Sequence, residues 1–161
     1  MPQPARSFRI RRARPADIAG LLALENASFA TDRMGARQLR RHIDSSSAEF
    51  LVATDDAQVL GAALVFLRRR SAVARLYSIA VADAARGLGL GTRLLEAAER
   101  RAQRRGARAM RLEVRSDNHA ARRLYEANGY RRIASLPSYY EDGADGARYE
   151  RELRERDGQV E

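Results

Sequence analysis

The chain has 161 residues, of which 45% are hydrophobic and 32% are charged, a balance typical of one globular domain rather than of a disordered chain. Its 30 basic and 21 acidic residues give a net charge of +9, and every basic residue is arginine, which excludes phosphate-binding loops and Schiff bases that depend on lysine. Cysteine is also absent, which excludes disulfides, thiol nucleophiles and a cysteine-linked acyl-enzyme.

Composition also bears on location and partners. No apolar run approaches about 18 residues, the length that a membrane-spanning helix requires, so we expect a soluble, cytoplasmic protein with no membrane partner. His42 and His119 are the only imidazoles, and we expect no metal site. The positive charge would suit an anionic partner, but the arginine runs at 68–70 and 100–101 are more typical of solvated surface, so we expect no nucleic-acid partner.

The N-terminal half mixes strand and helix patterns. Alternating apolar residues predict strands, and apolar residues three or four positions apart predict helices. In chain order we expect a strand at 8–12, a helix at 18–27, a short helix at 36–43, and strands at 49–54, 59–67 and 74–81. Because the turn residues Asp55 and Asp56 separate two of these strands, those two should form a hairpin.

The C-terminal half opens with the clearest helix pattern, in which apolar residues recur on one face from Leu90 and Gly106 is placed to end the helix. In chain order we expect this helix at 90–105, a strand at 109–114, a helix capped at 116–118 and closed by Gly129, and strands at 130–136 and 148–153. This order of elements predicts an α/β or α+β fold around one mixed sheet.

A glycine-rich turn at 86–91 joins a predicted strand to the helix that begins near Leu90. Glycine lets the backbone turn tightly and approach a ligand, and the first amides of a helix lack internal acceptors, so this turn can hold an anion such as a pyrophosphate. A tight turn without a ligand is the alternative. The dinucleotide fingerprint is not met, because Gly91 follows Gly89 by two positions rather than three.

Two blocks of the sequence resemble a known family. The stretch 76–81 followed by 86–91 resembles the acetyl-CoA motif Gln/Arg-x-x-Gly-x-Gly/Ala of the GNAT superfamily of N-acetyltransferases, with Arg86, Gly89 and Gly91 at the named positions. The stretch 112–130 is similar to the downstream block of the same family. The likeness is greatest to the branch that acetylates protein N-termini, typified by ribosomal-protein-alanine N-acetyltransferases.

The resemblance implies a fold and a reaction. The fold is one mixed, mostly antiparallel, splayed sheet of six to seven strands flanked by about four helices, in a single acetyltransferase domain over 1–153 followed by a polar tail at 154–161. The implied reaction moves acetyl from acetyl-CoA to a primary amine by direct attack in a ternary complex. We favour the α-amino group of a peptide or protein as the acceptor.

Other acceptors and other functions stay open. The segment 28–37 lacks the Pro-Trp pair of the ribosomal branch, so lysine side chains and small-molecule amines remain alternative acceptors. A basic nucleic-acid-binding module and a non-catalytic acyl-CoA-binding protein are the remaining alternatives.

Transfer to an amine requires a proton acceptor for the amine and a proton donor for the departing thiolate. Glu113 interrupts an apolar strand, and the resemblance implies that it is the base; an ion pair with Arg111 or Arg115 is the alternative. The resemblance implies that Tyr125 protonates the thiolate, and a core aromatic is the alternative.

Binding residues are also implied by the resemblance. Asn118 is a helix cap by its position, and the resemblance adds a contact with the coenzyme. The implied coenzyme-binding residues are Ile79, Ala80, Val81, Arg86, Gly87, Leu88, Gly89, Leu90, Gly91, Thr92, Asn118 and Tyr125. Tyr139 and Tyr140 are expected to line the acceptor slot, with ordinary surface or core aromatics as the alternative.

Overall fold

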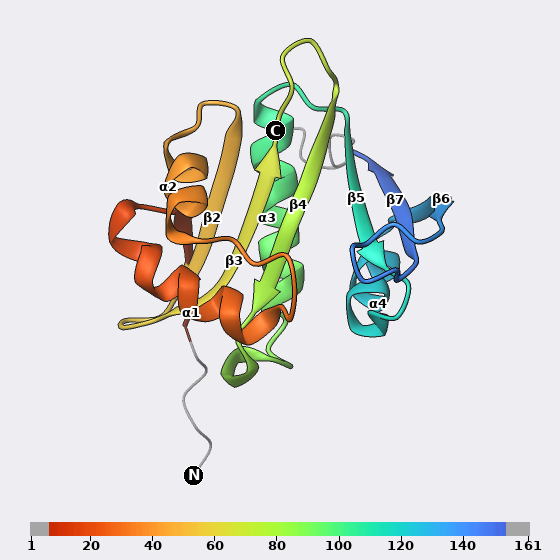
Figure 1. Ribbon diagram of the computed structural model, residues 1–161. Coiled ribbons are helices and arrows are strands. Elements are labelled where there is room, and N and C mark those ends of the chain that lie inside the picture. Colours follow the sequence, from red (N-terminus) through yellow and green to blue (C-terminus); the bar gives the residue numbers. More distant parts are fainter. Residues whose placement is uncertain (1–6, 154–161) are drawn as a thin grey trace.

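The computed structural model describes residues 7–153, so the predicted polar tail at 154–161 lies outside the described residues. Seven strands form one sheet in the order β1-β2-β3-β4-β5-β7-β6 (Figure 1). Their bounds are β1 Arg9–Arg12, β2 Ala48–Thr54, β3 Val59–Phe66, β4 Val73–Val81, β5 Ala109–Arg115, β6 Arg131–Leu136 and β7 Gly146–Glu152. Every neighbouring pair is antiparallel except β4 and β5, which confirms the mixed, mostly antiparallel sheet.

Four helices flank the sheet, as predicted. They are α1 Ile18–Ser28, α2 Ala36–Asp44, α3 Leu90–Arg104 and α4 His119–Ala127, and short 3-10 turns at Pro15–Asp17 and Asp83–Ala85 precede α1 and α3. Figure 1 shows α1 and α2 in front of the half of the sheet that contains β2–β4 and α3 behind that half, while α4 lies with the other half, at β5 and β7. None of the helices within 7–153 is long and apolar enough to cross a membrane.

The alternation of side chains along the central strands builds a core on each face of the sheet. In β2, Leu51 packs in the cluster that includes α3, while Phe50 and Val52 pack in the cluster that includes α1 and α2. The strands β2 and β3 are therefore buried on both faces, which explains why their sequences are almost continuously apolar.

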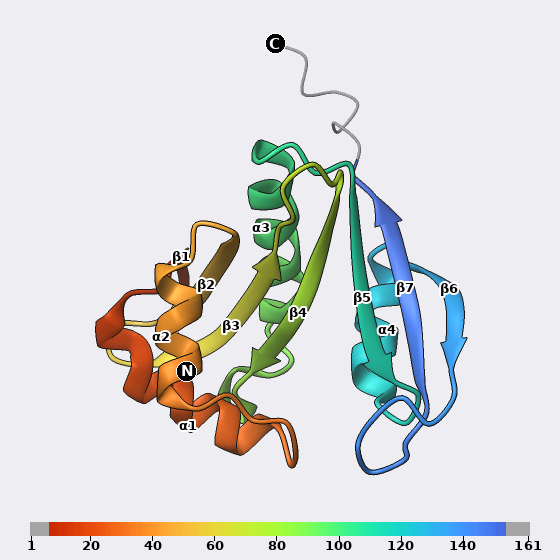
Figure 2. The ribbon, with the colours of Figure 1, turned by 45° about the horizontal axis from the view of Figure 1, so that its top comes forward.

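The sheet divides between β4 and β5. These parallel strands pair only at 73–75 with 109–111, and beyond Arg75 they diverge (Figure 2). The pairing of β4 with β3 also shifts near this point, because Leu64 pairs with Ser78 and Val65 with Leu76, so that Tyr77 is an extra residue. Such a β-bulge bends its strand and increases the local twist. The bulge thus accompanies the divergence, and the splayed sheet is confirmed.

A buried polar cluster ties the two halves of the molecule together. Tyr130, which follows α4, donates its hydroxyl to Glu99 of α3 at 2.8 Å, and Arg151 of β7 contacts the same carboxylate at 2.9 Å. The hydroxyl and the guanidinium compensate for burying a carboxylate in the core. This cluster fixes the position of β7 and the end of α4 relative to α3. It therefore also fixes how β5 diverges from β4.

Candidate active site

The glycine turn leads from the end of β4 into α3. Gly87 and Gly89 have φ angles of +78° and +75°, in the region that favours glycine, and Gly89 caps the start of α3. A Cβ atom built at either residue would meet nothing within 4 Å, so the space beside the turn is open. The first backbone N–H groups of α3, from Leu90 to Thr92, have no acceptor within their own helix. The turn is therefore an open cradle for an anion.

Gly91 has a different role from the other two glycines. Its φ is ordinary, but a Cβ there would lie 3.4 Å from Leu124 of α4 and 3.9 Å from Val81 of β4. These are ordinary van der Waals distances, so α4 packs directly against the junction of β4 and α3. As a result the turn, the end of β4 and α4 meet at one place.

The other residues of the turn face solvent. Arg86 pairs with Asp83 at 3.1 Å, and both side chains are exposed. An exposed ion pair contributes little, so the guanidinium can leave it for a ligand anion. Leu88 is half-exposed at the tip of the turn.

The last residues of β4 have one free edge. Ile79, Ala80 and Val81 pair with Ala63, Ala62 and Gly61 of β3, while their other edge pairs with no described strand because β5 has diverged. Unpaired backbone groups at a sheet edge can bind an extended ligand in the manner of an added strand.

Glu113 lies in the middle of β5 with its carboxylate almost fully buried. Arg75 of β4 approaches one carboxylate oxygen at 2.7 Å, and Arg148 of β7 approaches the other at 3.2 Å. Glu113 is thus ion-paired, but not with the expected alternative partners Arg111 and Arg115, which contact Glu150 and Asp142. Arg148 stands directly opposite Glu113 in the pairing of β5 with β7, and Arg75 reaches it diagonally from β4, where it pairs with Arg111.

Tyr125 lies in the last turn of α4, and its side chain is buried against the ring of Tyr130 at 5.8 Å. Burial raises the pKa of Tyr125 well above its ordinary value, and the nearby Tyr140 adds to the shift. Its hydroxyl makes no hydrogen bond to any residue within 7–153. The ring is buried, but its hydroxyl is not one of the fully buried side-chain atoms that lack a partner in the described residues, so it is available to a ligand.

The loop between β6 and β7 brings Tyr140 beside these two residues. Burial raises the pKa of Tyr140 to about 12, and the charges of Tyr139 and Glu113 contribute. Arg115 lies 5.2 Å from the centre of the Tyr140 ring. Tyr140 thus lies within electrostatic reach of both Glu113 and Tyr125, whereas Tyr139 contacts Tyr140 edge-on and is itself 42% exposed.

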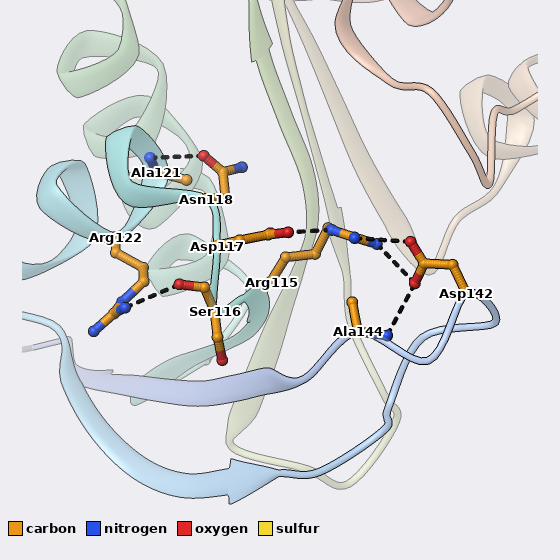
Figure 3. A network of polar contacts seen from close by, with 8 residues as sticks. All are labelled: Arg115, Ser116, Asp117, Asn118, Ala121, Arg122, Asp142 and Ala144. Atoms are coloured by element: carbon orange, nitrogen blue, oxygen red, sulfur yellow. Dashed lines mark hydrogen bonds and ion pairs between the residues drawn. The ribbon is translucent and has the colours of Figure 1, made fainter.

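A polar network fixes this loop and the start of α4 (Figure 3). Arg115, at the end of β5, binds Asp142 of the loop at 2.8 Å and Asp117 at 3.3 Å. Asn118 accepts a hydrogen bond from the Ala121 N–H at 3.2 Å, which confirms its predicted capping role. The amide nitrogen of Asn118 makes no hydrogen bond within the described part of the chain, so it is free to bind a ligand.

Residues 18–130 match the model of the Acetyltransferase (GNAT) family. The chain belongs to this family. It is 30% identical over 140 residues to the uncharacterized N-acetyltransferase YhfO of Bacillus subtilis, with 81% of this chain and 94% of the relative covered. It is 29% identical to an N-alpha-acetyltransferase of Sulfurisphaera tokodaii, with 87% and 90% covered.

Solved structures agree with this assignment. Ard1 of Thermoplasma volcanium superimposes with a TM-score of 0.82 at 28% identity, covering 92% of this chain and 99% of that one. The acetyltransferase yncA of Salmonella typhimurium, solved with acetyl-CoA, gives a TM-score of 0.79 at 25% identity and covers 92% and 95%. The protein is thus a GNAT N-acetyltransferase, an acyltransferase with acetyl-CoA as its acetyl donor.

Three charged residues of this GNAT enzyme were not found from the sequence. Two are Arg75 and Arg148, which contact Glu113. The other is Glu25 of α1, which is buried, accepts a hydrogen bond from the Met34 N–H at 2.9 Å, and lines a cavity of about 10 Å³ together with Ser78. Burial raises the pKa of Glu25. Its place four residues after the apolar Leu21 on one helix face could have revealed it.

The described side chains of the enzyme offer no metal site. Within residues 7–153, no three His, Cys, Asp or Glu residues gather closely enough to hold a metal ion.

Proposed function

We propose that this GNAT enzyme acetylates the α-amino group of a peptide or protein N-terminus, and that Glu113 and Tyr125 carry the proton transfers. The observation that supports this most directly is that Glu113 of β5 and the unpaired Tyr125 hydroxyl of α4 both lie within electrostatic reach of Tyr140, in the half of the molecule that diverges from β4. The named activity of a related protein, the N-alpha-acetyltransferase of Sulfurisphaera tokodaii, favours the same acceptor class.

A carboxylate base also favours an α-amino acceptor. Two guanidinium groups orient the Glu113 carboxylate, and a carboxylate is a modest base. An α-amino group has a pKa of about 7.7–8.0, whereas a lysine side chain has about 10.4. A modest base can maintain the α-amino group in its neutral, nucleophilic form much more readily than a lysine.

For the donor, we infer that the turn at 86–92 binds the coenzyme pyrophosphate and that the free edge at Ile79–Val81 binds the pantetheine arm. The N–H groups at the start of α3 and the free amide of Asn118 are the donors available for this purpose. The open space beside Gly87 and Gly89 lets a bulky phosphate approach the backbone.

In the proposed reaction, acetyl passes directly from the coenzyme sulfur to the acceptor nitrogen. The amine nitrogen attacks the thioester carbonyl carbon, the C–N bond forms, and the C–S bond breaks. Glu113 accepts the proton that the amine loses, directly or through one water, and the Tyr125 hydroxyl gives its proton to the departing sulfur. The proton gained by Glu113 and the proton lost by Tyr125 are exchanged with solvent when the products leave.

A peptide assay tests the acceptor class. Three peptides of one sequence would be incubated with acetyl-CoA and the enzyme: one with a free N-terminus and no lysine, one with a blocked N-terminus and one internal lysine, and one with both. Because the chain contains no lysine, acetylation of the enzyme itself cannot be mistaken for lysine transfer. We expect mass spectrometry to find acetyl only on free N-termini, and transfer restricted to lysine would contradict the proposal.

We also propose that residues 1–153 form the single catalytic domain. The cytoplasmic location stays a prediction.

A further inference from the structure

Arg75 occupies the point where the sheet divides. It is the last residue of β4 that pairs with β5, opposite Arg111, and it lies two residues before the bulge at Tyr77. Its neighbours Ala74 and Leu76 pack in the cluster that includes α3, so Arg75 lies on the opposite face of the sheet. Its side chain is 48% exposed, in contrast to 7% for Glu113.

The guanidinium group of Arg75 is held in place, but not all of its N–H donors have an acceptor. One nitrogen, Nη2, lies 2.7 Å from Glu113, and the group stands 5.8 Å from the centre of the Tyr77 ring. Tyr77 in turn packs against Phe66 at 4.9 Å. Within residues 7–153, no acceptor contacts the remaining N–H groups of the Arg75 guanidinium. An arginine has five N–H donors in a planar fork, so a free edge remains for a ligand.

The local charge is also unbalanced. Arg75 and Arg148 share the single carboxylate of Glu113, which leaves one positive charge in excess beside the candidate base. The next arginine on this face, Arg111, is neutralised by Glu150 at 3.4 Å. The excess charge is therefore concentrated where the acceptor amine must arrive.

We propose that Arg75 selects acceptors that carry a carboxylate close to the reacting amine, which means peptide N-termini with an acidic residue at the first or second position. This inference rests on the proposed function. Because Arg75 contacts Glu113 directly, a carboxylate on its free edge lies within a few ångströms of the base that serves the amine. The planar fork suits a carboxylate, and a basic side chain at the same position is repelled.

Peptides that differ only at the second residue test this selectivity with the full chain and acetyl-CoA. The set carries Asp, Asn or Lys after a common first residue, and kcat/KM is measured for each peptide. We expect the Asp peptide to exceed the Asn peptide by about tenfold, the scale of a charge-assisted hydrogen bond, and the Lys peptide to be poorest. The Asp preference should shrink as ionic strength rises.

The variant Arg75→Gln should bring the Asp/Asn ratio close to one. Its loss of contact with Glu113 lowers kcat/KM for both peptides alike, so the ratio reports selectivity alone. The matched control is Arg111→Gln, which removes an arginine from the same face without touching Glu113 and should keep the wild-type ratio. Arg75→Lys keeps the charge and should keep part of the preference.

The role of Arg75 and the proposed N-terminal acetylation fail in different experimental outcomes. Equal kcat/KM for the Asp and Asn peptides, or an Asp preference that survives Arg75→Gln, would overturn the role of Arg75 and leave N-terminal acetylation intact. If no free N-terminus were acetylated at all, the proposed function would fall and this inference with it. If Arg75→Gln did not fold, a wild-type Asp preference unaffected by salt would still count against the proposal.

Discussion

Glu113 and Arg148 face each other across β5 and β7, with the Arg148 Nε atom 3.2 Å from the Glu113 carboxylate. Arg75 approaches the other carboxylate oxygen from β4, on the far side of the divergence. The carboxylate is thus oriented by both halves of the split sheet. This geometry fixes its direction while it remains almost fully buried, as a proton acceptor in a preorganised site requires.

Replacing Glu113 tests its role as the base. Glu113→Gln keeps the shape of the side chain but cannot accept a proton, so kcat should fall by about 10²-fold or more. Acetyl-CoA affinity, measured by calorimetry, should change little because the candidate coenzyme contacts lie elsewhere. Glu150→Gln, on the same face of the sheet, is the control and should keep kcat. A Glu113→Gln enzyme with full kcat would show that the base is another group.

Removing the Tyr125 hydroxyl should lower kcat while leaving the free energy of unfolding almost unchanged. Because this hydroxyl makes no hydrogen bond in the described part of the chain, Tyr125→Phe should change the free energy of unfolding by only about 0.5 kcal/mol or less. The same change removes the candidate acid and should lower kcat by at least about tenfold. Urea unfolding and steady-state kinetics measure the two effects. A large loss of stability with unchanged kcat would assign Tyr125 to the core alone.

The neighbouring Tyr130 should behave in the opposite way. Its hydroxyl donates to the buried Glu99 at 2.8 Å, so Tyr130→Phe leaves a buried carboxylate with one partner fewer. We expect a loss of about 1–3 kcal/mol in the free energy of unfolding. At a temperature where the variant is folded, kcat should stay within about twofold of wild type. An unchanged urea midpoint would mean that Arg151 alone satisfies Glu99.

The features that the sequence predicted are those governed by local chemistry. The glycine turn, the helix that begins near Leu90 and the cap at Asn118 each depend on residues within a few positions of one another, and all three are present. The partners of Glu113 were not predicted, because Arg75 and Arg148 are 38 and 35 residues away in the chain and meet it only through strand pairing. The bulge at Tyr77 likewise depends on the register between β3 and β4.

Gly89 provides a test of the coenzyme site. Gly89→Ala places a side chain at a φ of +75° and a methyl group in the open space beside the turn. We expect a loss of about 1 kcal/mol in stability and at least about tenfold weaker acetyl-CoA binding by calorimetry. Gly106→Ala is the matched control, because its φ is +93° and its surroundings are equally open, but it lies at the other end of α3. Equal acetyl-CoA affinities in the two variants would contradict a pyrophosphate site at this turn.

Glu25 predicts a pH dependence of stability. Burial raises its pKa in the folded chain above the ordinary value of 4.5, so the folded chain binds more protons than the unfolded chain as pH rises past 4.5. The free energy of unfolding contributed by Glu25 therefore falls as pH rises through this range. Glu25→Gln keeps an acceptor for the Met34 N–H but does not titrate, so its stability relative to wild type should increase from pH 4.5 upward. Urea unfolding across a pH series measures this difference, and a constant difference would show that the carboxyl group is not affected by burial.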